Sequence, residues 1–248
     1  MTAEVPLVRR LPVLDEDECE AVCAQVHALR AHWLPRDSAA FHTLGAALYL
    51  DAPRAETVEH FGVPMPPSRQ YDERASRYGP LLRERFADLY RQIEAALGRA
   101  FDAEVRCAPD RAPPGFPIYQ HAPVYAQRAA HVPHFDRQYE CVSWSDHPDI
   151  EFREAISITL PIRLPASGGG LRVWDLSLFD VQARPREAAR ALARSAPSRV
   201  HAYRPGELVC HHGHLLHQVA PWVSGPGDER ITLQGHGLRY DGAWHLYW

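Results

Sequence analysis

The sequence contains no lysine, so its 27 basic residues are all arginine. Schiff-base chemistry needs a titratable amine, and the phosphate-binding loop of P-loop enzymes needs its own lysine, so both mechanisms are excluded. Any anion that this protein binds must therefore be held by arginine, by histidine or by backbone N–H groups.

Other absences narrow the class of protein further. The formal net charge is -4, and no run of arginines provides the basic surface of a nucleic-acid-binding protein. No apolar stretch approaches the roughly 20 residues of a membrane span, and residues 1–18 lack the apolar region of a signal peptide. The five cysteines are odd in number and include no CxxC pair, unlike a secreted disulfide framework. We therefore expect a cytoplasmic protein that binds neither nucleic acid nor membrane.

The pattern of apolar residues changes near residue 115. Before this point the spacing predicts a helix after Asp15, a second helix over 79–97 ended by Gly98, and mostly loop over 51–76. After it, short runs rich in β-branched and aromatic residues predict strands, interrupted by one surface helix over 186–196. We predict one domain, 1–248, of α+β class, with residues 1–115 as a mostly helical support region and 116–248 as a sandwich or jelly roll.

Among the 15 histidines, one motif stands out. In His134-Phe135-Asp136, the first and third residues would lie on the same face of a strand and can bind one metal ion together. A histidine from a distant strand would complete a triad of two imidazoles and one carboxylate, which leaves three positions of an octahedral iron open. An HxD motif alone is weak evidence, because a strand histidine is commonly satisfied by its neighbours.

The third ligand is expected in a second histidine-rich stretch. His217 is the best candidate, because Arg230 follows it after 13 residues in a distinctive context. Three other histidines compete for this role, with the last of them as second choice: His211, His212 and His214. The spacing HxHxxH over 212–217 would also suit zinc in a hydrolase, although a hydrolytic site gives no reason for the arginine that follows.

Arg230 and Thr232 would share one strand face by the same alternation. A guanidinium fork beside a hydroxyl is suited to hold a carboxylate through two hydrogen bonds. The alternative is that Arg230 pairs with Asp228 or Glu229 at a strand end, as surface arginines commonly do. The ordered combination of HxD, distal histidine and RxT is more specific than any of its parts.

In this combination the chain resembles the iron(II)/2-oxoglutarate-dependent oxygenases (dioxygenases), whose pattern is HxD, a distal histidine, and RxS or RxT about a dozen residues later. The resemblance covers roughly residues 116–240 and includes GGGLRVWD and PGELVCHHGHLLHQVAP. It implies a double-stranded β-helix (jelly roll, cupin-like) core in which His134, Asp136 and His217 bind iron(II). Arg230 and Thr232 would then bind the distal carboxylate of the cosubstrate 2-oxoglutarate, and no catalytic residue is implied beyond the metal ligands.

The resemblance also implies a reaction. With O2, 2-oxoglutarate would be converted to succinate and CO2, while an unactivated sp3 carbon of a small molecule is hydroxylated, desaturated or cyclised. An amino acid or a specialised metabolite, within a biosynthetic route, is the expected substrate class. Neither the substrate itself nor the oligomeric state follows from the sequence.

Two other classes of function remain open at this point. A different metal-dependent jelly-roll enzyme, either a zinc hydrolase or a cupin oxygenase independent of 2-oxoglutarate, predicts that Arg230 is dispensable for binding a cosubstrate. A non-catalytic binding module predicts that His134 and Asp136 point into packing instead of toward a shared metal ion.

Two tyrosines and one connection are further candidates for the site. Tyr119 and Tyr125 precede the HxD motif, and we expect them to line the substrate pocket. The polar connection 138–153 is too long for a tight hairpin, and we expect it to border the active site as a lid.

Overall fold

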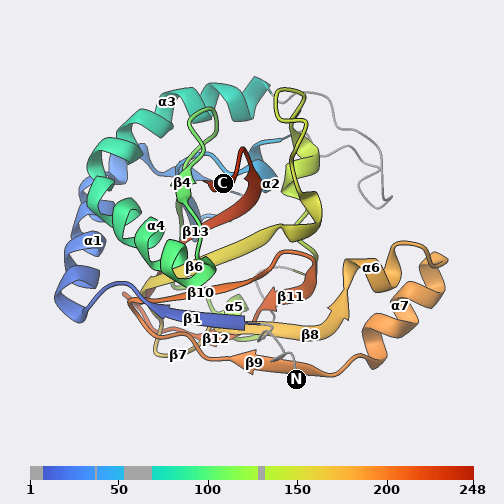
Figure 1. The fold of residues 1–248 in the computed structure, drawn as a ribbon. Helices are drawn as coiled ribbons and strands as arrows, with labels where there is room; N and C mark the ends of the chain where they lie inside the picture. Colours follow the sequence, from blue (N-terminus) through green and yellow to red (C-terminus); the bar gives the residue numbers. More distant parts are fainter. Residues whose placement is uncertain (1–7, 37, 53–68, 128–131) are drawn as a thin grey trace.

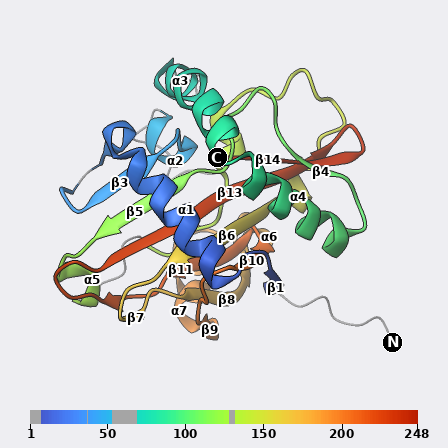
Figure 2. The same ribbon diagram turned by 90° about the vertical axis from the view of Figure 1, so that its left-hand side faces the viewer.

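A computed structural model describes residues 8–36, 38–52, 69–127 and 132–248. A large sheet lies between a layer of helices and a smaller sheet (Figures 1 and 2). The strands of the large sheet are β1 (Val8–Pro12), β2 (Leu34–Pro35), β3 (Phe41–Leu44), β4 (Val105–Cys107), β5 (Phe116–Gln120), β6 (Ile156–Arg163), β10 (Glu207–His212), β13 (Glu229–Tyr240) and β14 (Ala243–Tyr247). The remaining strands are β7 (Ser167–Gly168), β8 (Leu171–Ser177), β9 (Ser198–His201), β11 (Leu215–Val219) and β12 (Trp222–Val223).

The strand order shows how distant parts of the chain meet. The large sheet runs β1-β10-β6-β13-β5-β3-β2, with β14 beside β13 and β4 beside β14. The small sheet runs β11-β8-β9, and β12 pairs with β7. The pairings are antiparallel except the one between β14 and β4. The large sheet therefore takes strands from both sides of residue 115.

The helices of the described residues are α1 (Glu16–Ala28), α2 (Leu48–Asp51), α3 (Arg69–Arg85), α4 (Ala87–Phe101), α5 (Val124–Gln127), α6 (Leu178–Val181) and α7 (Arg186–Ser195), with short 3-10 turns η1 (Arg30–His32), η2 (Gln138–Cys141) and η3 (Phe152–Glu154). Helix α1 begins where expected, because the Asp15 side chain accepts from the Glu18 N–H and the Glu18 side chain accepts in return from the Asp15 N–H. None of these helices is long and apolar enough to span a bilayer.

The two faces of the large sheet differ in chemistry, and this difference positions the site. On β13, Ile231 and Leu233 face the helices and pack in a core with residues of α1 and α4. Alternate residues of the strand point to the other face, toward the small sheet. They include Arg230, Thr232 and His236. The same alternation along a strand places apolar side chains under the helices, while the opposite face carries these polar side chains together with apolar ones such as Val209, which packs against β8 and β11.

The structure confirms the expected α+β class with mainly antiparallel sheets and corrects several details. The single helix expected over 79–97 is two helices. The second passes Gly98 and ends at Phe101, and its C-cap, Asp102, adopts the left-handed conformation at φ 51. A glycine near a helix end is tolerated when a later residue can supply the left-handed cap. In the loop expected over 51–76, residues from Arg69 onward form helix α3, while 53–68 lie outside the described residues.

Candidate metal centre and carboxylate site

The HxD motif does not lie in a regular strand, contrary to expectation, but in an extended segment fixed by backbone hydrogen bonds. His134 forms a single bridge with His217 on β11, in which each backbone N–H donates to the other's carbonyl at 3.0 Å. The Asp136 N–H donates to the Gly213 carbonyl at 2.8 Å. Because residues paired across an antiparallel bridge point to the same side, the bridge aligns the two histidine side chains.

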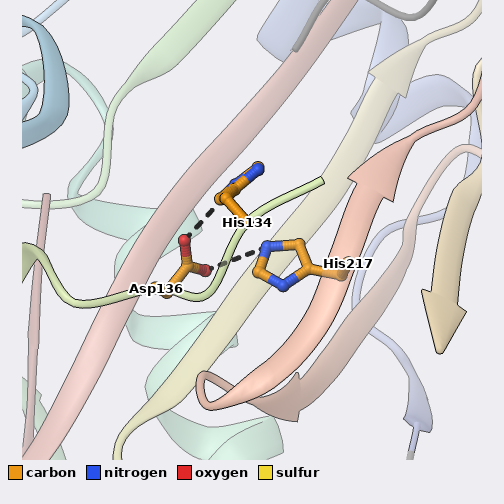
Figure 3. Close-up of side chains that lie close together, drawn as sticks. All are labelled: His134, Asp136 and His217. Carbon is orange, nitrogen blue, oxygen red and sulfur yellow. Dashed lines mark ion pairs between the residues drawn. The ribbon is translucent and has the colours of Figure 1, made fainter. Parts of the chain in front are cut away.

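The side chains of His134, Asp136 and His217 converge between the two sheets (Figure 3). Asp136 lies in the middle, with Oδ1 3.6 Å from His134 Nε2 and Oδ2 3.3 Å from His217 Nε2. One ligand atom from each residue lies within 4.8 Å of the others, and no second group of this kind occurs among the described residues. Two imidazoles and one carboxylate thus lie close enough together to bind one metal ion.

Backbone carbonyls fix the orientation of both imidazoles. The Nδ1 atoms of His134 and His217 lie 2.8 Å from the carbonyls of Val132 and Leu215, respectively, so each ring donates its Nδ1–H to the backbone. This hydrogen bond leaves the Nε2 atom of each ring facing Asp136, where it is free to bind a metal ion in place of a proton. A metal-binding histidine typically has its second nitrogen held in this way.

Asp136 is 6% exposed, yet its surroundings favour the charged form. Burial alone would raise its pKa, but the nearby imidazoles, first of all His217, hold the pKa well below the usual range. In return, burial alone would lower the pKa of His217, but the Asp136 carboxylate raises it. An ionised carboxylate beside two imidazole nitrogens is a donor set suited to a divalent metal ion, which binds once the imidazoles have released their protons.

The other three histidines of the second stretch have different surroundings. The ring of His211 lies 4.5 Å from that of His217, but its Nδ1 contacts the neighbouring His212 carbonyl and it is outside the cluster. His212 accepts a hydrogen bond from the backbone of His214. His214 Nε2 lies 2.8 Å from the hydroxyl of Tyr139. Of the four candidates, the structure brings only His217 into the cluster.

Arg230 is 1% exposed and lies in an aromatic environment. Its guanidinium carbon is 5.5 to 5.8 Å from the ring centres of Tyr119, Tyr203 and Trp222. Its hydrogen bond to the Gly169 carbonyl is long, at 3.4 Å, and its Nε and Nη1 have no hydrogen-bond partner among the residues that the structure describes. A buried cation with unused donors is costly unless an anion joins it, so these atoms indicate a site for a negatively charged ligand.

Thr232 and the nearby backbone complete the surroundings of Arg230. The Thr232 hydroxyl is fully buried and has no hydrogen-bond partner within the described part of the chain. A side chain at Gly169, where φ is +69, would come within 3.3 Å of Arg230 Nε, so glycine permits this close approach. The surface pairing considered for Arg230 is absent among the described residues, because Glu229 pairs with His27 and Asp228 binds the Gly225 N–H.

The two tyrosines expected near the site occupy different places. Tyr119 lies opposite Arg230 in the sheet register and stacks on Phe41 at 4.3 Å between ring centres. Tyr125 stacks on Trp222 at 4.4 Å, and its hydroxyl lies 3.4 Å from the Ser38 hydroxyl. Tyr119 therefore borders the arginine directly, while Tyr125 lies one aromatic layer behind it.

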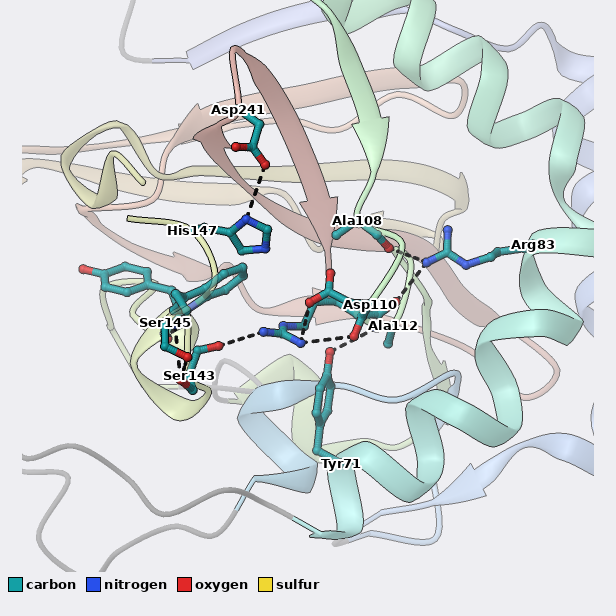
Figure 4. A network of polar contacts seen from close by, with 12 residues as sticks. Tyr71, Arg83, Ala108, Asp110, Ala112, Ser143, Ser145, His147 and Asp241 are labelled. Atoms are coloured by element: carbon teal, nitrogen blue, oxygen red, sulfur yellow. Dashed lines mark hydrogen bonds and ion pairs between the residues drawn. The ribbon is translucent and has the colours of Figure 1, made fainter. Parts of the chain in front are cut away.

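The connection 138–153 is packed onto the large sheet at its far end and touches the site region at its start. The guanidinium of Arg111 lies 4.8 Å from the ring of Trp144 and donates to the Ser143 carbonyl at 2.7 Å. His147 pairs with Asp241 at 3.4 Å (Figure 4). The start of the connection, at Tyr139, reaches His214. Its role as a lid stays a prediction.

The sequence analysis did not identify three residues beside the candidate metal centre: Gln138, Ser157 and His236. Gln138 Nε2 donates to Asp136 Oδ1 at 2.8 Å, and the Ser157 hydroxyl donates to Asp136 Oδ2. His236 Nδ1 lies 3.6 Å from the same Oδ2 atom. For His236 a signal existed, because the alternation that aligns Arg230 with Thr232 also aligns them with residue 236. No signal in the sequence pointed to Ser157, since its strand pairing was unknown.

Known proteins resemble this chain in structure. No protein-family model and no curated protein matches it in sequence. A novel N-substituted L-amino acid dioxygenase from Burkholderia ambifaria AMMD, in complex with alpha-KG, is similar with a TM-score of 0.57 and 16% identity, covering 97% of this chain and 85% of that chain. The non-heme, alpha-ketoglutarate-dependent carbocyclase SnoK from nogalamycin biosynthesis has a TM-score of 0.51 and 14% identity, covering 94% of this chain and 79% of that chain.

A second protein from nogalamycin biosynthesis, the non-heme, alpha-ketoglutarate-dependent epimerase SnoN, has a TM-score of 0.50 and 14% identity, covering 94% of this chain and 80% of that chain. At these identities the likeness concerns the fold. The chain thus has the fold of iron(II)/2-oxoglutarate-dependent oxygenases over nearly its whole length, together with a His-Asp-His cluster, and the resemblance seen in the sequence is confirmed at this level.

Proposed function

We propose that this protein is an iron(II)/2-oxoglutarate-dependent oxygenase that oxidises an unactivated sp3 carbon of a small molecule, such as an amino acid or a specialised metabolite. Hydroxylation is the primary reaction proposed, with desaturation and cyclisation as variants. Two relatives in fold bear on the substrate class, because one is described as an amino acid dioxygenase and the other as a carbocyclase from the biosynthesis of nogalamycin.

The observation that carries the proposal is the buried guanidinium of Arg230, two of whose three nitrogens have no hydrogen-bond partner among the described residues. A zinc hydrolase or a cupin oxygenase that does not use 2-oxoglutarate has no need for a cation sealed among aromatic rings with two free donor atoms. A dicarboxylate cosubstrate explains it, because one carboxylate can pair with the arginine while the other end reaches the metal. A non-catalytic binding module would not explain why two imidazoles converge on Asp136.

Each residue then has a distinct task. His134, Asp136 and His217 would hold iron(II), and Arg230 with Thr232 would hold the distal carboxylate of 2-oxoglutarate. Tyr119 would form part of the wall beside that carboxylate, and Tyr125 would support the wall from behind. When bound, iron(II) and 2-oxoglutarate supply the oxidising chemistry with O2, while the protein supplies position and a water-poor environment.

The proposal extends to the organisation of the chain. We infer one domain over 1–248, in which residues 116–248 form a double-stranded β-helix of the jelly-roll type and 1–115 support it. The small sheet packed over the polar face of the large sheet favours this interpretation. We also propose a cytoplasmic location, in keeping with five cysteines that are all free thiols.

Anaerobic titration with iron(II) and 2-oxoglutarate tests the proposed function. A wild-type protein that chelates both should develop a weak visible charge-transfer band, and it should form succinate once air is admitted. The Asp136→Ala variant should lose the band, and Arg230→Ala should require far more 2-oxoglutarate to develop it. Absence of both band and succinate in the wild type would overturn the proposal.

A further inference from the structure

Besides the imidazoles, the carboxylate of Asp136 has one further side-chain donor on each oxygen. Gln138 Nε2 donates to Oδ1 at 2.8 Å, and the hydroxyl of Ser157 donates to Oδ2. The donors come from different parts of the chain, one from η2 just after Asp136 and the other from β6. Together they fix the rotation of the carboxylate plane about the Cβ–Cγ bond, since turning it would break both hydrogen bonds.

Ser157 stands in the middle of a polar row that crosses three neighbouring strands of the large sheet. In the register of the sheet, Ser157 on β6 lies opposite His211 on β10 and opposite His236 on β13. Directly opposite residues share a face, so all three side chains point between the sheets. All three are buried, and Ser157 is 5% exposed. A hydroxyl in this position is shielded from competing water.

The direction of the hydrogen bonds in this row is set by the bond from Ser157 to Asp136. The Ser157 hydroxyl donates to Oδ2, so its single hydrogen is already used. The Ser157 oxygen can therefore only accept from His236, whose Nδ1 lies 3.5 Å away and 3.6 Å from Oδ2 itself. In its Nδ1–H tautomer, His236 would direct its donor at the pair formed by Ser157 and Asp136.

We propose that Ser157, backed by His236, is a positioning residue that presents the Asp136 carboxylate to the metal ion in one fixed orientation. The inference rests on the proposed metal centre and adds residues that the HxD and distal histidine pattern does not contain. Residues that orient a metal ligand in this way commonly change metal affinity by about 10- to 100-fold when they are removed. A purely structural serine would affect folding stability without changing the ligand field of the metal.

The test is a titration of the full-length protein with Co(II), whose visible d–d bands report the ligand geometry without any turnover. Ser157→Ala should bind Co(II) about 10- to 100-fold more weakly than the wild type, with altered d–d bands. Ser157→Thr keeps the hydroxyl and should restore both affinity and spectrum. His236→Asn retains an N–H near the position of Nδ1 and should resemble the wild type, whereas His236→Leu should show a smaller loss than Ser157→Ala.

The matched control is Ile158→Val, on the same strand but facing the helices, where Ile158 is 1% exposed. It should lower stability and leave the Co(II) spectrum unchanged. If Ser157→Ala does not fold, Gln138→Met removes the other donor and should weaken Co(II) binding in the same direction. Wild-type affinity and spectrum in Ser157→Ala would overturn the inference while leaving the proposed function intact. Failure of the wild type to bind Co(II) would instead overturn the metal centre itself, and the inference with it.

Discussion

The two ends of the polar face of β13 each lie beside a buried charge, and the surroundings of these two charges differ. Near His236, the buried charge of Asp136 is surrounded by partners, with a donor on each oxygen and imidazoles on both sides. Near Arg230, the buried charge has one long hydrogen bond and two donor atoms without partners. The two positions lie six residues apart on the same face of one strand.

This difference separates a site whose side chains are already oriented from a site whose charge still needs an anion. At the Asp136 end, internal hydrogen bonds orient the side chains in advance, so little reorganisation is needed when a metal ion binds. At the Arg230 end, the unsatisfied guanidinium lowers the stability of the ligand-free protein, and this cost is offset only when an anion arrives. Removing the charge at either end should therefore have effects of opposite sign on stability.

The largest effect is expected from Asp136→Ala. Loss of the central carboxylate removes one of three ligands and leaves the imidazoles of His134 and His217 without their shared partner. Iron(II) affinity should fall by more than about 100-fold, beyond what loss of an orienting residue causes, and succinate formation should stop. Equilibrium binding and a succinate assay measure both, with His212→Gln as the control. If Asp136→Ala binds iron(II) as tightly as the wild type, the proposed metal site at the Asp136 end is wrong.

The substitution Arg230→Met should separate binding from stability. Loss of the charged partner should raise the apparent KM for 2-oxoglutarate by at least about 30-fold, from the roughly 2 kcal/mol or more that such truncations cost. The same change should stabilise the ligand-free protein, by about 1 kcal/mol or more, because a buried charge without partners is replaced by an apolar side chain. Steady-state kinetics and thermal unfolding measure the two effects. Arg230→Lys keeps the charge without the planar fork and should give an intermediate KM.

A smaller effect is expected from Thr232→Val. The variant removes one hydrogen bond to the cosubstrate, so the apparent KM for 2-oxoglutarate should rise about 10-fold, equivalent to about 1.5 kcal/mol. Thr232→Ser retains the hydroxyl and should stay close to the wild type. An unchanged KM in Thr232→Val would restrict the carboxylate site to Arg230.

The smallest effect is expected on the pH dependence of stability and involves His214, which belongs neither to the surroundings of Asp136 nor to those of Arg230. Burial, and then the charge of His212, lowers the pKa of His214 to about 4. The unfolded chain, with an ordinary pKa near 6.5, takes up this proton first, so the free energy of unfolding should decrease as the pH falls from about 6.5 toward about 4. His214→Gln should reduce that slope, as measured by denaturant unfolding at several pH values. Identical slopes would mean that His214 is not held neutral by its surroundings.

Local patterns predicted much of this molecule because they depend on short stretches of chain. The runs that contain β6, β8, β10 and β13 are recognisable by composition, and helix α7 by its spacing. Strand β14 was missed, since AWHLY has no distinct alternation and is placed by pairing with β13. The break between α3 and α4 was also missed, because a continuous apolar stripe does not reveal a turn at Phe86.

The sequence by itself determined the donor set: an HxD motif, a histidine stretch, and an arginine two residues before a threonine, in a chain without lysine. Motif order and strand alternation suffice for these inferences, because both act over a few residues. Only the tertiary structure decided which histidine faces Asp136, that Arg230 is sealed among three rings, and that Ser157 and His236 stand behind the carboxylate. Those relations depend on strand register across the sheet, where a shift of one residue would turn every side chain to the opposite face.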